Sequence, residues 1–173
     1  MSDVVTISGS PSASSRTAAV LGALAAELGR AGLASQAIEV RTLPPSDLVG
    51  GRAQDPATRA AIERIAAARA VVVGTPVYKA AFTGLLKAFL DLLPQDLLAG
   101  KVALPIAVGA APAHALAVEQ TLAPLLLALG ADAVVRGLYL LDAQFTQGEA
   151  DAAAAAALSA AALRLARFVG GRP

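Results

Sequence analysis

The sequence predicts a doubly wound α/β fold, in which a five-stranded parallel sheet of order 2-1-3-4-5 carries helices on both faces. Short apolar or β-branched runs alternate with helical patterns along the 173 residues, as in successive βαβ units. One run, Ala70–Gly74, is continuously apolar, which is typical of a parallel strand buried on both faces. The length suits one domain, and neither a repeat nor a linker is visible, so we expect residues 1–173 to form a single unit.

The strands of this sheet are marked by runs that end in glycine, proline or polar residues. The second run alternates polar and apolar residues, so we expect a partly exposed strand at the sheet edge. The fourth run contains Pro105, and the fifth contains Gly137, which we interpret as a bulge site. The predicted strands are Val4–Ile7, Ser35–Val40, Ala70–Gly74, Val102–Val108 and Ala133–Leu141.

Helical patterns fill the intervals between the strands and follow the last one. Ser14 or Ser15 can cap the first helix, which ends near Gly32, and Asp55 caps the second with Pro56 at its first position. The later helices are predicted at Thr83–Leu93, Ala113–Leu129 and Ala150–Val169, the last of them rich in alanine, the best helix former. A polar stretch with Pro44, Pro45, Gly50 and Gly51 is expected to be a loop.

The composition excludes several classes of function. The chain has no cysteine and one histidine, His114, so a metal site is not expected, and a net charge of +1 gives no field for nucleic acid. The first residues lack the segments of a signal peptide. The longest uncharged run, Val102–Val118, is broken by Pro105, Gly109 and Pro112, so no membrane span is expected there. We therefore expect a cytoplasmic enzyme without a metal, nucleic-acid or membrane partner.

The loop after the first strand has the chemistry of a phosphate site. In a 2-1-3-4-5 sheet, the loops after strands 1 and 3 flank the crevice where ligands bind. The first loop supplies hydroxyls and a guanidinium directly before a helix N-terminus, a combination that favours a monophosphate. It matches neither Gly-x-Gly-x-x-Gly nor the P-loop, and the alternative interpretation is a capped helix start without a ligand. The residues concerned are Ser10, Ser12, Ser15, Arg16 and Thr17.

Two further loops suit a flat ring. After the third strand, Pro76 and Val77 lead to Tyr78, which can stack on a heterocycle, and to Lys79, which can place a charge near a nucleotide. After the fourth strand, the small residues Gly109 and Ala110 let the backbone approach a ring, and His114 begins the next helix. The alternative in each case is a plain turn. Four carboxylates are interpreted as caps or solvated side chains: Asp91, Asp96, Asp132 and Asp142.

These motifs resemble those of the NAD(P)H-dependent FMN reductase family. They are Gly-Ser-Pro-x-x-x-Ser-Arg-Thr at residues 9–17 and Thr-Pro-Val-Tyr-Lys-Ala-Ala-Phe-Thr-Gly-Leu-Leu-Lys at residues 75–87. The similarity extends through most of the chain, and its most specific part is Thr75–Lys101. The branch it resembles is the reductase partner of alkanesulfonate monooxygenases. Gln120 stands where such reductases can carry an inserted tyrosine that makes a π-bulge at a subunit interface.

The resemblance implies a flavodoxin-like fold, FMN as a substrate or loosely held cofactor, NADPH or sometimes NADH as the hydride donor, and homodimers or homotetramers. It implies that Ser10, Ser15, Arg16 and Thr17 hold the FMN phosphate. It implies that Pro76, Val77, Tyr78 and Lys79 border the isoalloxazine and ribityl chain, with Gly109 and its neighbours opposite.

We therefore predict a flavin reductase that passes a hydride from NADPH to FMN and supplies reduced FMN to a two-component monooxygenase of sulfonate or organosulfur type. Three alternatives stay open: a quinone or azo reductase that retains FMN, a flavodoxin-type electron carrier, and a flavin-free binding module. The net charge of +1 argues against the carrier, because carriers that dock basic partners are usually strongly acidic.

Overall fold

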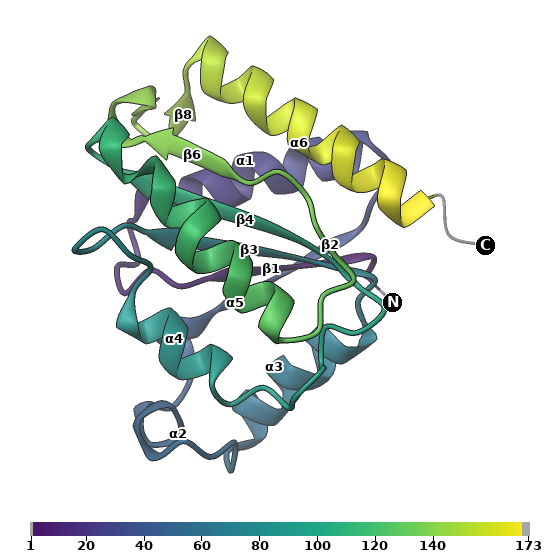
Figure 1. The fold of residues 1–173 in the computed structure, drawn as a ribbon. Helices are drawn as coiled ribbons and strands as arrows, with labels where there is room; N and C mark the ends of the chain where they lie inside the picture. The colour runs from purple at the N-terminus through teal and green to yellow at the C-terminus, as the bar shows by residue number, and fades with distance from the viewer. Residues whose placement is uncertain (1, 171–173) are drawn as a thin grey trace.

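A parallel sheet of order β2-β1-β3-β4-β5 forms the centre of the fold, and β6 also pairs with β4 (Figure 1). The computed structural model describes residues 2–170, so both ends of the unit predicted for 1–173 lie outside the described residues. The predicted doubly wound order is confirmed, with β2 at an edge as its alternating pattern indicated. The strands are β1 (Val4–Ser8), β2 (Ser35–Glu39), β3 (Ala70–Pro76), β4 (Val102–Gly109), β5 (Ala133–Val134) and β6 (Leu138–Leu141).

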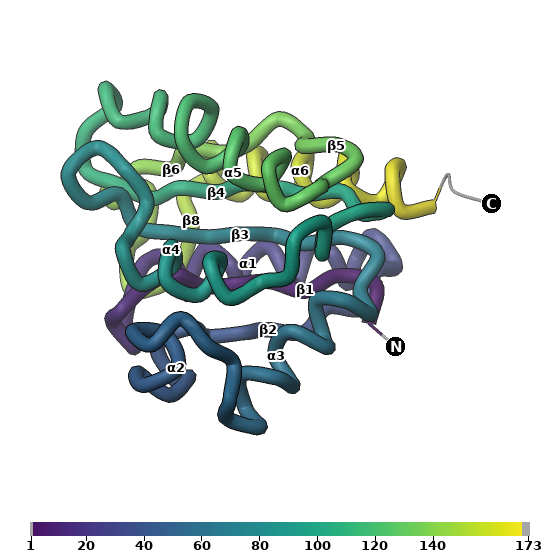
Figure 2. Tube along the Cα trace, turned by 60° about the horizontal axis from the view of Figure 1, so that its bottom comes forward, coloured from purple at the N-terminus to yellow at the C-terminus, as the bar shows by residue number. Residues whose placement is uncertain are grey.

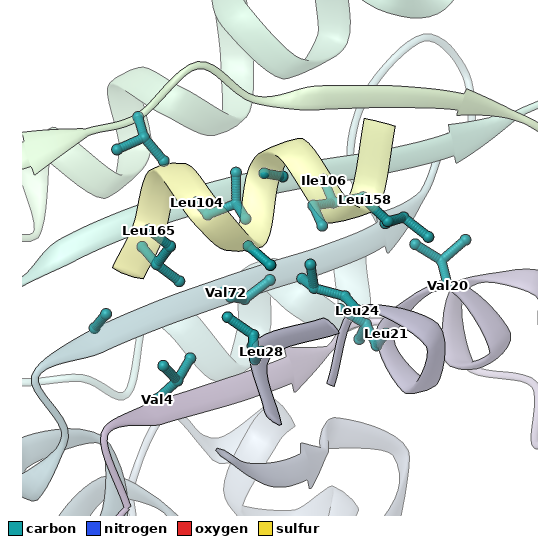
Figure 3. Packing of buried hydrophobic residues seen from close by; sticks show 14 of the residues in the cluster. Val4, Val20, Leu21, Leu24, Leu28, Val72, Leu104, Ile106, Leu158 and Leu165 are labelled. Carbon is teal, nitrogen blue, oxygen red and sulfur yellow. The ribbon is translucent and has the colours of Figure 1, made fainter. Parts of the chain in front are cut away.

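Helices cover both faces of this sheet. Figure 2 shows β2, β1, β3 and β4 side by side in this order, with α3 and α4 on one side and α1 on the other. Buried apolar side chains of α1 and α6 pack on one face of β1, β3 and β4 (Figure 3), and those of α3, α4 and α5 pack on the opposite face. The helices are α1 (Arg16–Arg30), α2 (Pro45–Gly50), α3 (Pro56–Ala67), α4 (Gly84–Leu90), α5 (Ala123–Ala128) and α6 (Ala152–Gly170).

The fifth predicted strand is interrupted rather than continuous. β5 pairs with Val102 and Ala103 of β4, and β6 pairs with the segment from Ile106 to Gly109, so Pro105 lies where β4 has no partner on that side. A Cβ at Gly137 would lie 2.9 Å from Pro105 Cγ and 2.3 Å from Val118 Cγ1. The glycine expected to form a bulge thus permits close packing at the break. Proline in β4 is tolerated because no neighbouring strand needs its missing N–H there.

The helix starts follow the sequence closely, but two segments differ from expectation. Ser15 caps α1 by accepting from the Ala18 N–H, and Asp55 caps α3 in the same way, as predicted. The stretch expected to be a loop contains α2 instead. Pro45 stands in the first turn of α2, where its missing N–H costs nothing, and Gly51 ends the helix at a φ of 66°.

The helix expected at Ala113–Leu129 is divided into three segments. It comprises the 3₁₀ turn η2 (Pro112–Ala115), the π turn η3 (Val118–Leu122) and α5. In the π turn the Thr121 hydroxyl donates to the Ala117 carbonyl at 2.5 Å, and Gln120 is exposed. A π turn therefore exists here with glutamine in place of the tyrosine that the resemblance associates with it.

The C-terminal helix α6 is confirmed within one or two residues of its predicted start and end. By length and composition alone it could cross a membrane. In the fold it packs on α1 and β4 through Ala154, Leu158, Ala161 and Leu165, which are fully buried. These contacts show that α6 packs against one face of the sheet and contributes to the hydrophobic core. Before it, β7 (Phe145–Thr146) and β8 (Glu149–Ala150) form a short hairpin that the sequence did not predict.

Candidate functional site

An open hollow of about 340 Å³ lies at the carboxyl ends of β1, β3 and β4. This is the crevice in which ligands bind to doubly wound sheets, and the volume falls in the range of small-molecule sites. Every predicted binding residue except Lys79 lines it, together with His114 and Asp142. The predicted residues that line it are Ser10, Ser12, Ser15, Arg16, Thr17, Pro76, Val77, Tyr78, Gly109 and Ala110.

The first loop is held tightly under the hollow. Gly9 donates its N–H to the Gly74 carbonyl at 2.8 Å, and its own carbonyl accepts from the buried Thr83 hydroxyl at 2.6 Å. A Cβ at Gly9 would lie 2.6 Å from Leu86 Cβ, so the loop passes too close to α4 for any side chain there. The Ser10 hydroxyl is buried and accepts from the Ser12 N–H at 3.2 Å. These contacts fix the path of the loop before α1.

The end of the hollow at the start of α1 has the donors that a phosphate needs. Arg16 extends from the first helical residue with more than half of its side chain exposed. The Thr17 hydroxyl is buried and has no hydrogen-bond partner among the described residues. An unpaired buried hydroxyl is costly unless a ligand satisfies it, and a helix N-terminus favours an anion. The donor set therefore fits the phosphate group of FMN.

The second loop forms one wall of the hollow through Pro76, Val77 and Tyr78, but Lys79 does not line it. Tyr78 and Ala81 exchange two backbone hydrogen bonds of 2.9 and 3.1 Å, which close a tight turn. Lys79 and Ala80 at its tip have φ values of 52° and 63°, a backbone conformation that residues other than glycine rarely adopt. Tyr78 remains about half exposed at the edge of the hollow, where its ring is free to stack. In the part of the chain that the structure describes, Lys79 is not among the residues that line the hollow, although the sequence analysis expects it there.

Two residues that the sequence analysis missed shape the other side. Tyr139 on β6 donates its hydroxyl to the Ala111 carbonyl at 2.6 Å and so holds the loop after β4. Burial, with the Asp142 carboxylate nearby, raises the pKa of Tyr139 above its usual range. Asp142 lines the hollow, and its Oδ1 lies 3.9 Å from Arg16 Nε. The sequence analysis interprets Asp142 as a cap or solvated side chain, whereas the structure places it in the lining of the hollow. Its place directly after a parallel strand is the signal that indicates a site residue.

Comparisons with known proteins identify the family of the chain. The model of a family described as NADPH-dependent FMN reductase matches residues 2–146. The chain belongs to this family.

The names of two relatives of this FMN reductase state the nicotinamide nucleotide that each one uses. The "FMN reductase (NADPH)" of Pseudomonas putida is 41% identical over 146 residues, covering 84% of this chain and 74% of the relative. The "NADH-dependent FMN reductase SfnF", also of Pseudomonas putida, is 34% identical over 149 residues, covering 83% and 80%. A solved structure described as NADH:FMN oxidoreductase (EMOB) in its apo form has a TM-score of 0.89 and 39% identity, covering 100% of this chain and 92% of that one.

These findings confirm the expected family, the flavodoxin-like fold, and an oxidoreductase that uses FMN with NADPH or NADH. Among residues 2–170 no group of three or more histidine, cysteine or acidic side chains is arranged to hold a metal ion.

Proposed function

We propose that this FMN reductase binds FMN as an exchangeable substrate, transfers a hydride to it from NADPH, and supplies reduced FMN to a two-component monooxygenase acting on sulfonates or other organosulfur compounds. The observation that carries the flavin site is the buried Thr17 hydroxyl beside Arg16 at the start of α1, which has no hydrogen-bond partner within residues 2–170. A monophosphate satisfies both groups at once.

The residues of the hollow divide into two roles under this proposal. The hydroxyls of the first loop, Arg16 and Thr17 hold the phosphate, and the wall from Pro76 to Tyr78 lies along the flavin ring. Gly109 and Ala110 bring the backbone close to the ring from the other side. Lys79, at the exposed tip of its turn, meets the nicotinamide nucleotide rather than FMN.

The reaction places few demands on acid or base catalysis. Bound in the hollow, FMN would supply the hydride acceptor and the nicotinamide nucleotide the hydride, so the redox chemistry would belong to the two nucleotides. The chain contributes binding, orientation and exclusion of water. Backbone N–H groups around the hollow can stabilise the negative charge of a reduced flavin. A hollow whose only histidine is His114 and which contains no cysteine suits such a reaction.

The monooxygenase partner is the finer part of the proposal. It rests on the motifs shared with sulfonate-linked reductases, and the similarity to proteins named SfnF and SfnE supports it. The relatives include both NADPH- and NADH-dependent enzymes, so both donors belong in the assay. A cytoplasmic location and a homodimer or homotetramer are part of the same proposal.

The first test is steady-state oxidation of NADPH and of NADH by the purified protein, with and without added FMN. We expect a rate that rises and saturates with FMN. A yellow protein that reduces quinones without added FMN would instead favour a reductase that retains its flavin. If neither donor is oxidised under any condition, the proposed function is wrong, and the carrier or binding module is preferred.

The phosphate assignment has its own test in Arg16→Ala. Removing a charged hydrogen-bond donor should weaken FMN binding by about 1.5–3 kcal/mol, or roughly 10- to 150-fold. Arg52→Ala is the matched control, because Arg52 is exposed and lies outside the hollow. Fluorescence titration of FMN measures both variants. An FMN affinity that is equal in Arg16→Ala and in the wild-type protein would contradict the assignment.

A further inference from the structure

The Asp142 carboxylate lies at the end of the hollow where we propose that the phosphate binds. A negative charge at this position opposes the binding of an anion. Asp142 follows β6 directly and lines the same hollow as Arg16 and the first loop. Its Oδ1 is 3.9 Å from Arg16 Nε, and about two fifths of its side chain is exposed. Within residues 2–170 this is the only ion pair that either side chain forms.

The charges that face this end nearly cancel before a ligand arrives. Arg16 contributes one positive charge and Asp142 one negative charge; the other titratable groups close by are Tyr78 and His114, which line the hollow, and Tyr139. Burial, together with Asp142, raises the pKa of Tyr139, so its hydroxyl is neutral at physiological pH. Lys79 lies outside the hollow. An incoming phosphate therefore meets a guanidinium that already has an anionic partner.

We propose that Asp142 competes with the flavin phosphate for Arg16 and so sets the affinity for FMN low enough for the flavin to exchange between turnovers. This inference rests on the proposed function, in which FMN is the substrate of this hollow. Like charges in one site oppose binding, and a partly exposed pair can open and reform at little cost. The interaction of the phosphate with Arg16 is offset by the loss of the Arg16–Asp142 interaction, so its net contribution to FMN binding is smaller. When FMN leaves, the Arg16–Asp142 ion pair forms again, which favours release.

The competition predicts a gain of affinity from a conservative change. Asp142→Asn keeps the shape and one acceptor oxygen, replaces the other oxygen by an NH2 donor, and removes the charge. We expect it to bind FMN about tenfold more tightly, mainly through slower dissociation, because Arg16 then has no anionic partner that competes with the phosphate. Riboflavin, which has the same ring and ribityl chain but no phosphate, should bind equally to both proteins. The gain should shrink as ionic strength rises.

Fluorescence titrations with FMN and with riboflavin, and stopped-flow release of FMN, measure these effects. Glu63→Gln on α3 is the matched control, since it makes the same charge change at an exposed position outside the hollow. In an Arg16→Ala background the gain from Asp142→Asn should be clearly smaller. An equal gain there would indicate direct repulsion without competition and would overturn the proposal.

Two other results would also overturn it. Unchanged or weaker FMN binding by Asp142→Asn would mean that the carboxylate positions Arg16 or is irrelevant to the phosphate. Equal tightening of riboflavin would mean that Asp142 acts on the ribityl chain or the ring. Failure of the underlying function is recognised separately, because the wild-type protein would then show no saturable binding of FMN before any variant is compared.

Discussion

Gly109, the last residue of β4, lies so close to the Tyr139 side chain that adding one methyl group tests the Tyr139–Ala111 hydrogen bond at the edge of the hollow. A Cβ at this position would be 2.7 Å from Tyr139 Oη and 3.4 Å from Val77 Cβ. The hydroxyl is not free to move, because it donates a 2.6 Å hydrogen bond to the Ala111 carbonyl. Gly109→Ala therefore has to displace the hydroxyl and break this bond.

The expected magnitudes follow from that single bond. A typical intramolecular hydrogen bond contributes about 1 kcal/mol to stability, so Gly109→Ala and Tyr139→Phe should each lower the free energy of unfolding by about this amount. In the double variant the methyl group enters the space that the hydroxyl has left, and its nearest remaining neighbour is 3.4 Å away. The second substitution should then cost close to nothing, which gives a coupling energy of about 1 kcal/mol.

Urea unfolding of the four proteins measures this cycle. Gly22→Ala, made in the wild-type and Tyr139→Phe proteins, is the matched control, because nothing lies within 4 Å of a Cβ at Gly22 in α1. It should raise stability by about 0.5–1 kcal/mol in both backgrounds, as for glycine in a helix interior. If Gly109→Ala and Tyr139→Phe instead add to a loss of about 2 kcal/mol, the close contact does not act through the hydroxyl.

Two further predictions concern the same end of the sheet. Thr83→Val should lower the free energy of unfolding by about 2–4 kcal/mol, because it removes the cap of α4 and the donor to the buried Gly9 carbonyl. Thr146→Val at an exposed position should change it by less than about 0.5 kcal/mol, and urea unfolding that finds similar losses would refute this account. The pKa of Tyr139 is raised from 10.0 in the folded protein, so between pH 10.0 and the folded value the unfolded chain loses this proton first. The stability advantage of the wild-type protein over Tyr139→Phe is therefore full below pH 10.0 and should decline above it, and an advantage that grows there would contradict the sign.

The features that the sequence predicted well depend on neighbours along the chain. The order of the sheet follows from apolar runs of strand length between helical patterns. The loop proposed to hold a phosphate lies in the hollow as expected, because Ser15, Arg16 and Thr17 are adjacent and the cap and helix N-terminus beside them are local structures. A stretch with Pro45 and Gly51 was misjudged because both residues were interpreted only as breakers, although each also suits one end of a short helix.

The features that it predicted poorly depend on contacts between distant segments. The break between β5 and β6 is explained by Gly137 packing on Pro105 and Val118, two residues from other elements. The alternation of the run at 133–141 is compatible with one uninterrupted strand, so nothing local indicates where the break falls. For the same reason the direction of the Tyr139 side chain, and its bond to the loop after β4, could not be inferred from its neighbours.

This division has a consequence for the chemistry of the hollow. The groups that we propose to bind the phosphate are local to the first loop and can be recognised in the sequence, whereas Asp142, which we propose opposes them, lies more than 120 residues later in the chain. A motif can therefore identify the ligand class without indicating how tightly the ligand is held. Two chains with the same first loop should differ in flavin retention when the residue after their last sheet strand differs in charge, and exchanging that residue alone should transfer the difference.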